Sequence, residues 1–213
     1  WDDRLINITK AGESKTYCDE IKGIVNEAGL EISELATHLQ GQLIASHYAY
    51  DTMFDSFAPK ELQNNVKGRT EWAISQVKSA ASASKNLGID VMASFSGSLL
   101  FHTMYPWPQR PKGLVEAGFK ELAKRWTPIL DHFDNNGVDV CYEIHPGEDL
   151  HDGVTFERFL KATNNHSRVK ILYRSLIPIS NPTNPKRTCY AFFGWKKKNT
   201  NTPNYRYILH CDN

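Results

Sequence analysis

The strongest chemical signal in the sequence is a group of acidic and imidazole side chains that follows an apolar run. The run covers residues 138–144, and residues 143–149 read Glu-Ile-His-Pro-Gly-Glu-Asp. A carboxylate that ends a buried strand is unfavourable unless it is paired or bound to a cation. Glu143 and His145 are two residues apart, so on a regular strand both point to the same face. We expect them to reach one metal ion or one substrate hydroxyl. The simpler alternative is a Glu143 that pairs with a nearby Lys or Arg.

Three other residues occupy positions at which a site could form. His38 lies at the end of the apolar run 32–39, Glu148 follows a Pro-Gly turn, and Trp107 lies in the loop 105–111. An amphipathic aromatic ring such as that of Trp107 can stack on a sugar ring. Each position also has a structural alternative: a hydrogen-bonded histidine, a carboxylate exposed on a turn, and an aromatic ring packed within its loop.

Helices and strands alternate along the part of the chain that carries these residues. Apolar spacing and capping residues predict helices at 14–30, at 71–87, at 113–136 and after a cap at Thr155. Asp149, His151 and Asp152 fit the turn and helix start before this last helix. Apolar runs predict strands at 32–39, 89–95, 138–144 and 169–173.

This alternation indicates a parallel α/β fold, in which functional groups gather at the carboxyl ends of the strands. Strands that are covered by helices on both faces explain the continuous apolar runs. A doubly wound sheet and a (β/α)8 barrel are both compatible with the pattern. The sequence contains neither GxGxxG nor GxxxxGKS/T, which weakens the nucleotide-binding versions of these folds.

Composition excludes several classes of protein. The chain has 213 residues and a formal net charge of +1, so it suits one globular unit and offers no electrostatic case for nucleic-acid binding. No apolar run approaches the ~20 residues of a membrane helix. The four cysteines form no CxxC pair, so we expect reduced thiols and, by default, a cytoplasmic protein. Because the chain opens on Trp1, we expect a fragment of a longer protein.

Three stretches carry a resemblance to a known family. THLQGQL at 37–43, YPWPQRP at 105–111 and above all VDVCYEIHPGEDLHDGVTFERFL at 138–160 resemble the sugar phosphate isomerase/epimerase proteins of the xylose isomerase-like superfamily. The resemblance covers residues 1–173. It implies a partial (β/α)8 TIM barrel that lacks the first strand, most of the second and the last two. Trp1-Asp2 would then be the end of the second barrel strand.

The resemblance also implies a site and a reaction. Members of the family hold a divalent metal (Mn, Mg, Co or Zn) at the mouth of the barrel, and the motif EIHPGE makes Glu143 the fifth-strand ligand and the catalytic acid-base group. His38, Trp107, His145 and Glu148 would bind a small sugar or sugar phosphate. The implied reaction is isomerisation or epimerisation by proton transfer through an enediolate.

The sequence departs from the family after Tyr173. Arg174 stands where the family has an Asp that serves as the second metal ligand. Residues 174–213 form a basic tail rich in Asn and Pro, with little helical or strand periodicity. We expect a frameshift or intron read-through here, or else a genuine variant with a replaced C-terminal half. With one recognisable ligand out of the family's set, the chain is expected to bind metal weakly or not at all and to be inactive.

Three functional classes therefore stay open. The chain is a sugar isomerase or epimerase, a non-catalytic fragment of one, or an endonuclease-type metal hydrolase of the same superfamily. The near-neutral charge and the lack of a basic groove signature argue against the last class. We expect neither a nucleic-acid nor a membrane partner, and the residues specify no oligomeric state.

Overall fold

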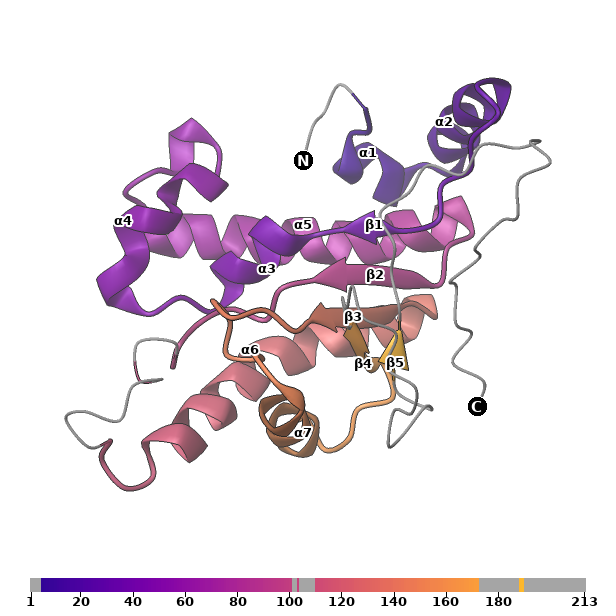
Figure 1. The fold of residues 1–213 in the computed structure, drawn as a ribbon. Helices are drawn as coiled ribbons and strands as arrows, with labels where there is room; N and C mark the ends of the chain where they lie inside the picture. The colour runs from indigo at the N-terminus through magenta and orange to yellow at the C-terminus, as the bar shows by residue number, and fades with distance from the viewer. Residues whose placement is uncertain (1–4, 101–102, 104–109, 173–187, 190–213) are drawn as a thin grey trace.

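The computed structural model describes residues 5–100, 103, 110–172 and 188–189. Five parallel strands of these segments form one sheet in the order β1-β2-β3-β4-β5, so neighbours in space are also consecutive in sequence (Figure 1). The strands are β1 (Leu35–Ala36), β2 (Val91–Ser94), β3 (Asp139–Glu143), β4 (Val169–Leu172) and β5 (Thr188–Cys189). In a doubly wound sheet the strand order reverses at one point, and it does not reverse among the described strands. The sheet therefore has the strand order of a barrel wall, as the partial barrel predicts.

Helices connect the strands, and three of them pack side by side in chain order. α5 contacts α6, and α6 contacts α7. The helices are α1 (Ile8–Glu13), α2 (Lys15–Glu27), α3 (His38–Ile44), α4 (Asp51–Phe54), α5 (Val66–Leu87), α6 (Leu114–Asn136) and α7 (Gly153–Ala162). Three single 3-10 turns flank α4, namely η1 (Tyr48–Tyr50), η2 (Asp55–Phe57) and η3 (Lys60–Leu62).

The expected alternation of helices and strands is confirmed, with local corrections. The helix expected at 71–87 begins at Val66. The strand expected at 32–39 has only two residues, because the N–H of Thr37 makes the last bond to β2 (Ala93 O, 2.8 Å) and α3 begins directly afterwards. Thr155 does not cap α7. Asp152 is the cap, and Thr155 completes a capping box in which its N–H donates to Asp152 Oδ1 over 2.7 Å.

The main core lies between the sheet and the helices. Trp126 of α6, Tyr142 of β3 and Phe159 of α7 are fully buried and pack edge to face, with ring centroids 4.9 and 5.1 Å apart. Burial of each ring contributes roughly 1.5–3 kcal/mol. Trp126 Nε1 also donates to the carbonyl of Ser96 (2.8 Å), which ties α6 to the loop after β2. The aromatic cluster thereby holds the ends of β2 and β3 in place.

The opposite face of the sheet carries a smaller cluster. Its buried members are Ala93, Cys141 and Leu172. Because side chains alternate along a strand, Glu143 shares this face with Cys141, whereas Tyr142 faces the helices. In a barrel this face is the interior. Cys18 and Cys141 are both buried.

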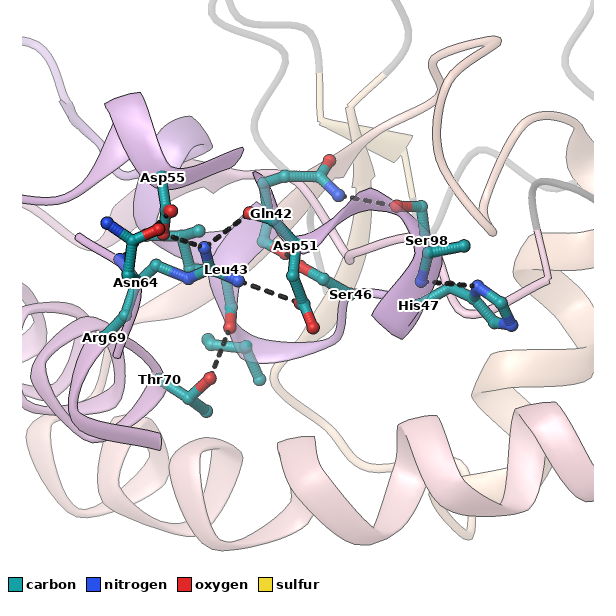
Figure 2. Close-up of polar contacts among 12 residues, drawn as sticks. Gln42, Leu43, Ser46, His47, Asp51, Asp55, Asn64, Arg69, Thr70 and Ser98 are labelled. Carbon is teal, nitrogen blue, oxygen red and sulfur yellow. Dashed lines mark hydrogen bonds and ion pairs between the residues drawn. The ribbon is translucent and has the colours of Figure 1, made fainter. Parts of the chain in front are cut away.

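A buried arginine holds the segment between α3 and α5 (Figure 2). Arg69 of α5 is 1% exposed and forms ion pairs with Asp51 (3.0 Å) and Asp55 (2.6 Å). Its guanidinium also donates to the carbonyl of Asp51 over 2.7 Å, and Asp55 Oδ2 accepts the N–H of Asn64 over 3.0 Å. Two carboxylates offset the cost of burying one guanidinium, so the segment 48–62 is tied to α5.

Several expectations concern residues outside the described part of the chain. They are the strand end at Trp1-Asp2, the loop residue Trp107, and Arg174 with most of the tail. Within the tail, β5 is described, and it pairs in parallel with β4 through Ile171 and Thr188. Among the described residues, no helix combines the length and the apolar character that crossing a bilayer requires.

Candidate functional site

Glu143, the last residue of β3, lies beside His38, the first residue of α3. Glu143 Oε2 is 2.9 Å from His38 Nε2, and Glu143 is 7% exposed. β2 lies between β1 and β3, so the contact passes over the carboxyl end of β2. An imidazole N–H next to a carboxylate offsets part of the cost of removing the carboxylate from water. The structure thus brings together two of the five residues expected at the site.

Gly41 and Thr37 let α3 start close enough to β2 for this contact. Thr37 Oγ1 makes no capping bond to α3 and instead donates to Ser94 Oγ of β2 (3.1 Å). A Cβ on Gly41 would overlap Ser94 Oγ and the carbonyl oxygen of Phe95. The helix therefore lies directly against the end of β2, which brings His38 to Glu143.

Phe95 follows β2 and contacts two imidazoles. Its ring centroid lies 4.7 Å from that of His38 and 5.0 Å from that of His145. His145 Nδ1 accepts the N–H of Gly147 over 3.1 Å, so a neutral His145 carries its proton on Nε2. His145 is exposed and therefore offers a donor N–H near the Glu143–His38 pair. Phe95 therefore links His145, the third expected site residue, to the pair of Glu143 and His38.

Glu148 lies in the protein interior, which corrects the alternative of a carboxylate exposed on a turn. It is 2% exposed, and its Oε2 accepts the N–H of Gly97 over 2.7 Å. The pKa of Glu148 is raised to about 8, chiefly by burial and also by the charges of Asp149 and Glu143, while the N–H of Gly97 works against the rise. Direct substrate binding by Glu148 stays a prediction.

Asp149 is a buried carboxylate and not merely a turn residue. Its two oxygens accept the N–H groups of Leu99 (2.8 Å) and Leu100 (2.7 Å), which are 50 and 49 residues away in sequence. Together with Phe95 and Gln42, it belongs to the residues around the site that sequence reasoning missed. For Gln42, its place in the THLQGQL motif was an available signal. For Phe95 and Asp149 no local signal exists, because their partners are distant in sequence.

A cavity of about 350 Å³ lies away from this pair, between the starts of α6 and α7. Its lining includes Arg110, His151 and Arg158, but neither Glu143 nor His38. Trp107 lies outside the described residues, so its stacking on a sugar stays a prediction. The candidate site is therefore the group at the carboxyl ends of β2 and β3, and not this cavity.

The donors of the site suit a divalent cation in part. Glu143 and His38 offer a carboxylate oxygen and an imidazole nitrogen, which Mn²⁺, Co²⁺ and Zn²⁺ accept as ligands. Among the residues that the structure describes, no group of three or more His, Cys, Asp or Glu side chains is arranged to hold a metal. Of this pair, the family resemblance implies only Glu143 as a metal ligand, and His38 was expected to bind substrate.

Several solved structures are similar to the chain, and two of them are compared with it. One is a xylose isomerase domain protein from Planctomyces limnophilus, with 13% identity over 75% of this chain and 49% of that chain and a TM-score of 0.48. The other is a D-psicose 3-epimerase determined in the presence of D-fructose, with 15% identity over 75% of this chain and 57% of that chain and a TM-score of 0.39. A search of curated proteins gives no match.

The chain therefore spans 49% and 57% of the lengths of these two structures. Both TM-scores are below 0.5, so the family assignment does not depend on them. It depends on the match to the family described as xylose isomerase-like TIM barrel, which covers residues 2–174. That range contains the strands β1 to β4 and every residue of the candidate site. The chain belongs to the xylose isomerase-like TIM barrel family.

Proposed function

We propose that the site of this chain is that of a divalent-metal-dependent isomerase or epimerase of a small sugar or sugar phosphate. The observation that carries the proposal is the position and burial of Glu143. This residue is a nearly buried carboxylate that ends a parallel strand, on the barrel-interior face of the sheet, with His38 at 2.9 Å. Acid-base groups and metal ligands of parallel barrels are typically carboxylates at the carboxyl ends of strands. Family membership makes a sugar the first substrate class to test.

The proposal assigns a role to Glu143 and to the residues expected around it. Glu143 is the metal ligand and the group that takes a proton from the carbon beside the carbonyl. His38 and His145 hydrogen-bond to sugar oxygens, His145 through its Nε2 proton, and Trp107 stacks on the sugar. A divalent cation, when bound by Glu143, would supply positive charge that stabilises an enediolate. Isomerisation and epimerisation differ only in where the proton returns.

Solvent isotope exchange tests the proposal across a whole class of sugars, so the individual substrate need not be identified first. The purified protein is incubated in D₂O with Mn²⁺, Co²⁺, Mg²⁺ or Zn²⁺ and a panel of ketoses and their phosphates, and deuterium entry next to the carbonyl is followed by NMR. We expect metal-dependent exchange that Glu143→Gln abolishes. Glu157→Gln, an exposed residue on α7, is the matched control and should exchange normally. If Glu143→Gln alters neither metal content nor exchange, the assignment is wrong.

The second candidate function is a non-catalytic chain, and the residue that favours it is Arg174. An arginine at the position of an acidic ligand removes a donor and adds a positive charge that repels a cation. If the chain is non-catalytic, we expect substoichiometric metal after dialysis against Mn²⁺ and no isotope exchange. Stoichiometric, tightly held metal would contradict it. In the same proposal, residues 1–173 are the barrel part and residues 174–213 a separate tail, so truncation after Tyr173 should cost only the two-residue pairing of β5 with β4.

A further inference from the structure

Two adjacent carboxylates of the β3–α7 loop bind the backbone of the β2–α6 loop. Glu148 Oε2 accepts the N–H of Gly97 (2.7 Å), and Asp149 accepts those of Leu99 and Leu100 (2.8 and 2.7 Å). In return, the N–H of Asp149 donates to the carbonyl of Gly97 (2.9 Å). Glu148 and Asp149 are each 2% exposed. The loops that leave two neighbouring strands are therefore bound together in the protein interior.

The same β2–α6 loop is bound to the end of α3. The N–H of Ser98 donates to the carbonyl of Ala45 (2.6 Å), and the Gln42 amide lies 2.6 Å from Ser98 Oγ (Figure 2). Gly97 has a φ of 97°, and a Cβ there would lie 2.5 Å from the Ala45 carbonyl oxygen. Only glycine tolerates both conditions, so the close approach of α3 and the loop is built into the backbone.

The Gln42 amide links Ser98 to Glu148. Figure 2 shows Gln42 Nε2 facing Ser98 Oγ. When the amide is turned over, Nε2 lies 3.2 Å from Glu148 Oε2 and Oε1 accepts the Ser98 hydroxyl proton. The turned amide suits an ionised Glu148. The orientation in Figure 2 suits a protonated Glu148 whose O–H donates to Gln42 Oε1. In both states Gln42 connects α3 to Glu148.

Among the described residues, Glu148 thus contacts the segments that carry His38, Phe95 and His145. Its carboxylate holds the loop that begins two residues after Phe95, whose ring touches both imidazoles. Its N–H donates to the carbonyl of His145 over 3.0 Å. Gln42 lies on α3 about one helical turn after His38, on the same side of the helix. A change at Glu148 is therefore transmitted to His38 and His145 by short, direct routes.

We propose that Glu148, together with Gln42, is a positioning residue that sets the placement of His38 and His145 and does not itself contact the substrate. The kinetic consequences rest on the proposed function, whereas the placement is a property of the folded chain. The burial of the carboxylate and its contacts with Gly97 and Gln42 carry the inference, because they direct its oxygens into the protein.

Two substitutions separate positioning from substrate binding. The amide of Glu148→Gln keeps an oxygen for the Gly97 N–H and an amide N–H for Gln42 Oε1, so positioning predicts that this variant resembles the unchanged protein. Glu148→Ala removes both contacts. If Glu148 were instead a substrate ligand or a catalytic carboxylate, both variants would lose activity. Glu157→Gln on the exposed face of α7 is again the matched control.

The first readout is independent of activity. Imidazole ¹⁵N and ¹H shifts of His38 and His145 are measured in the full chain without substrate, with His166, which lies near Asp131, as an internal reference. We expect Glu148→Ala to shift the signals of His38 and His145 but not those of His166, and Glu148→Gln to leave all three unchanged. A folded Glu148→Ala protein with unchanged His38 and His145 signals overturns the inference. If Glu148→Ala does not fold, Gln42→Ala is compared with the unchanged protein in the same way.

The second readout uses the isotope-exchange assay. We expect Glu148→Ala to lower kcat about tenfold with KM within about twofold, and Glu148→Gln to keep both constants. A Glu148→Gln protein that loses turnover as Glu148→Ala does would show that the carboxylate itself is required, which overturns positioning. No turnover in the unchanged protein counts against the proposed function alone, because the NMR comparison still decides the placement.

Discussion

His38 Nε2 and Glu143 Oε2 lie 2.9 Å apart, and the two side chains are only 16% and 9% exposed. The contact joins the start of α3 to the end of β3, on either side of β2. Because both groups are largely removed from water, each offsets part of the cost of burying the other. The pair is therefore a structural contact as well as the centre of the candidate site, and mutation can separate the two roles.

Removal of His38 should destabilise the fold more than neutralisation of Glu143. His38→Ala leaves a buried carboxylate without its imidazole and should lower the free energy of unfolding by ~2–4 kcal/mol at pH 7. Glu143→Gln leaves no buried charge, so His38→Ala should cost less in that background. Urea denaturation of the single and double variants measures the coupling. Additive effects of the two changes would show that the contact contributes nothing.

Replacement of Gly41 by alanine should displace α3 from β2. Alanine is the better helix former by ~1 kcal/mol, but the new Cβ would overlap the Phe95 carbonyl and Ser94 Oγ, so we expect a net loss of ~1–3 kcal/mol. Gly23→Ala on α2 is the control, because nothing lies within 4 Å of a Cβ there. It should stabilise the protein slightly. Denaturation midpoints that change in the same direction for both variants would refute the packing argument.

The helix ends and the pair of Glu143 and His38 could be predicted from local features of the sequence. Gly88 and Gly137, with φ of 75° and 72°, end α5 and α6 where the helical pattern predicts an end, because a left-handed cap depends on one residue alone. Glu143 and His38 were found because parallel strands bring their carboxyl ends to one edge of the sheet.

Other features depend on partners that are distant in sequence. Nothing around Glu148 or Asp149 indicates that their oxygens accept N–H groups of the loop 97–100. A turn was therefore expected for Asp149, and substrate binding or an exposed turn for Glu148. The shortness of β1 has the same origin, since α3 begins where it does through contacts of Thr37 and Gly41 with β2. Strand order likewise required the structure, because alternating helices and strands suit a doubly wound sheet as well as a barrel.

Arg69 should be essential for the folded structure of the segment 48–62. Arg69→Met removes a 1% exposed guanidinium and leaves Asp51 and Asp55 without their cation, so we expect a loss of ~3–5 kcal/mol and protease cleavage within that segment. The exposed pair of Lys67 and Glu71 offers a control, since Lys67→Met should cost less than ~0.5 kcal/mol. Asp51→Asn and Asp55→Asn, added to Arg69→Met, should restore part of the loss. A protease-resistant Arg69→Met protein would contradict this assignment.

Glu34, directly before β1, should make stability fall as pH rises. Its Oε1 is buried without a hydrogen-bond partner among the described residues, and burial raises its pKa from 4.5 to about 7. Between these values the unfolded chain has released the proton while the folded chain keeps it. The free energy of unfolding therefore decreases through this window, by ~1–3 kcal/mol, and the loss is complete above pH 7.

Glu34→Gln removes this dependence, because an amide does not titrate. We expect the stability of the variant relative to the unchanged protein to increase by ~1–3 kcal/mol from pH 4.5 to pH 8. Glu31→Gln, an exposed neighbour, should show no such change. Urea denaturation at half-unit pH steps measures both differences. If the Glu34→Gln difference is the same at pH 5 and pH 8, the carboxyl of Glu34 is ionised in the folded chain throughout, and burial does not control its protonation.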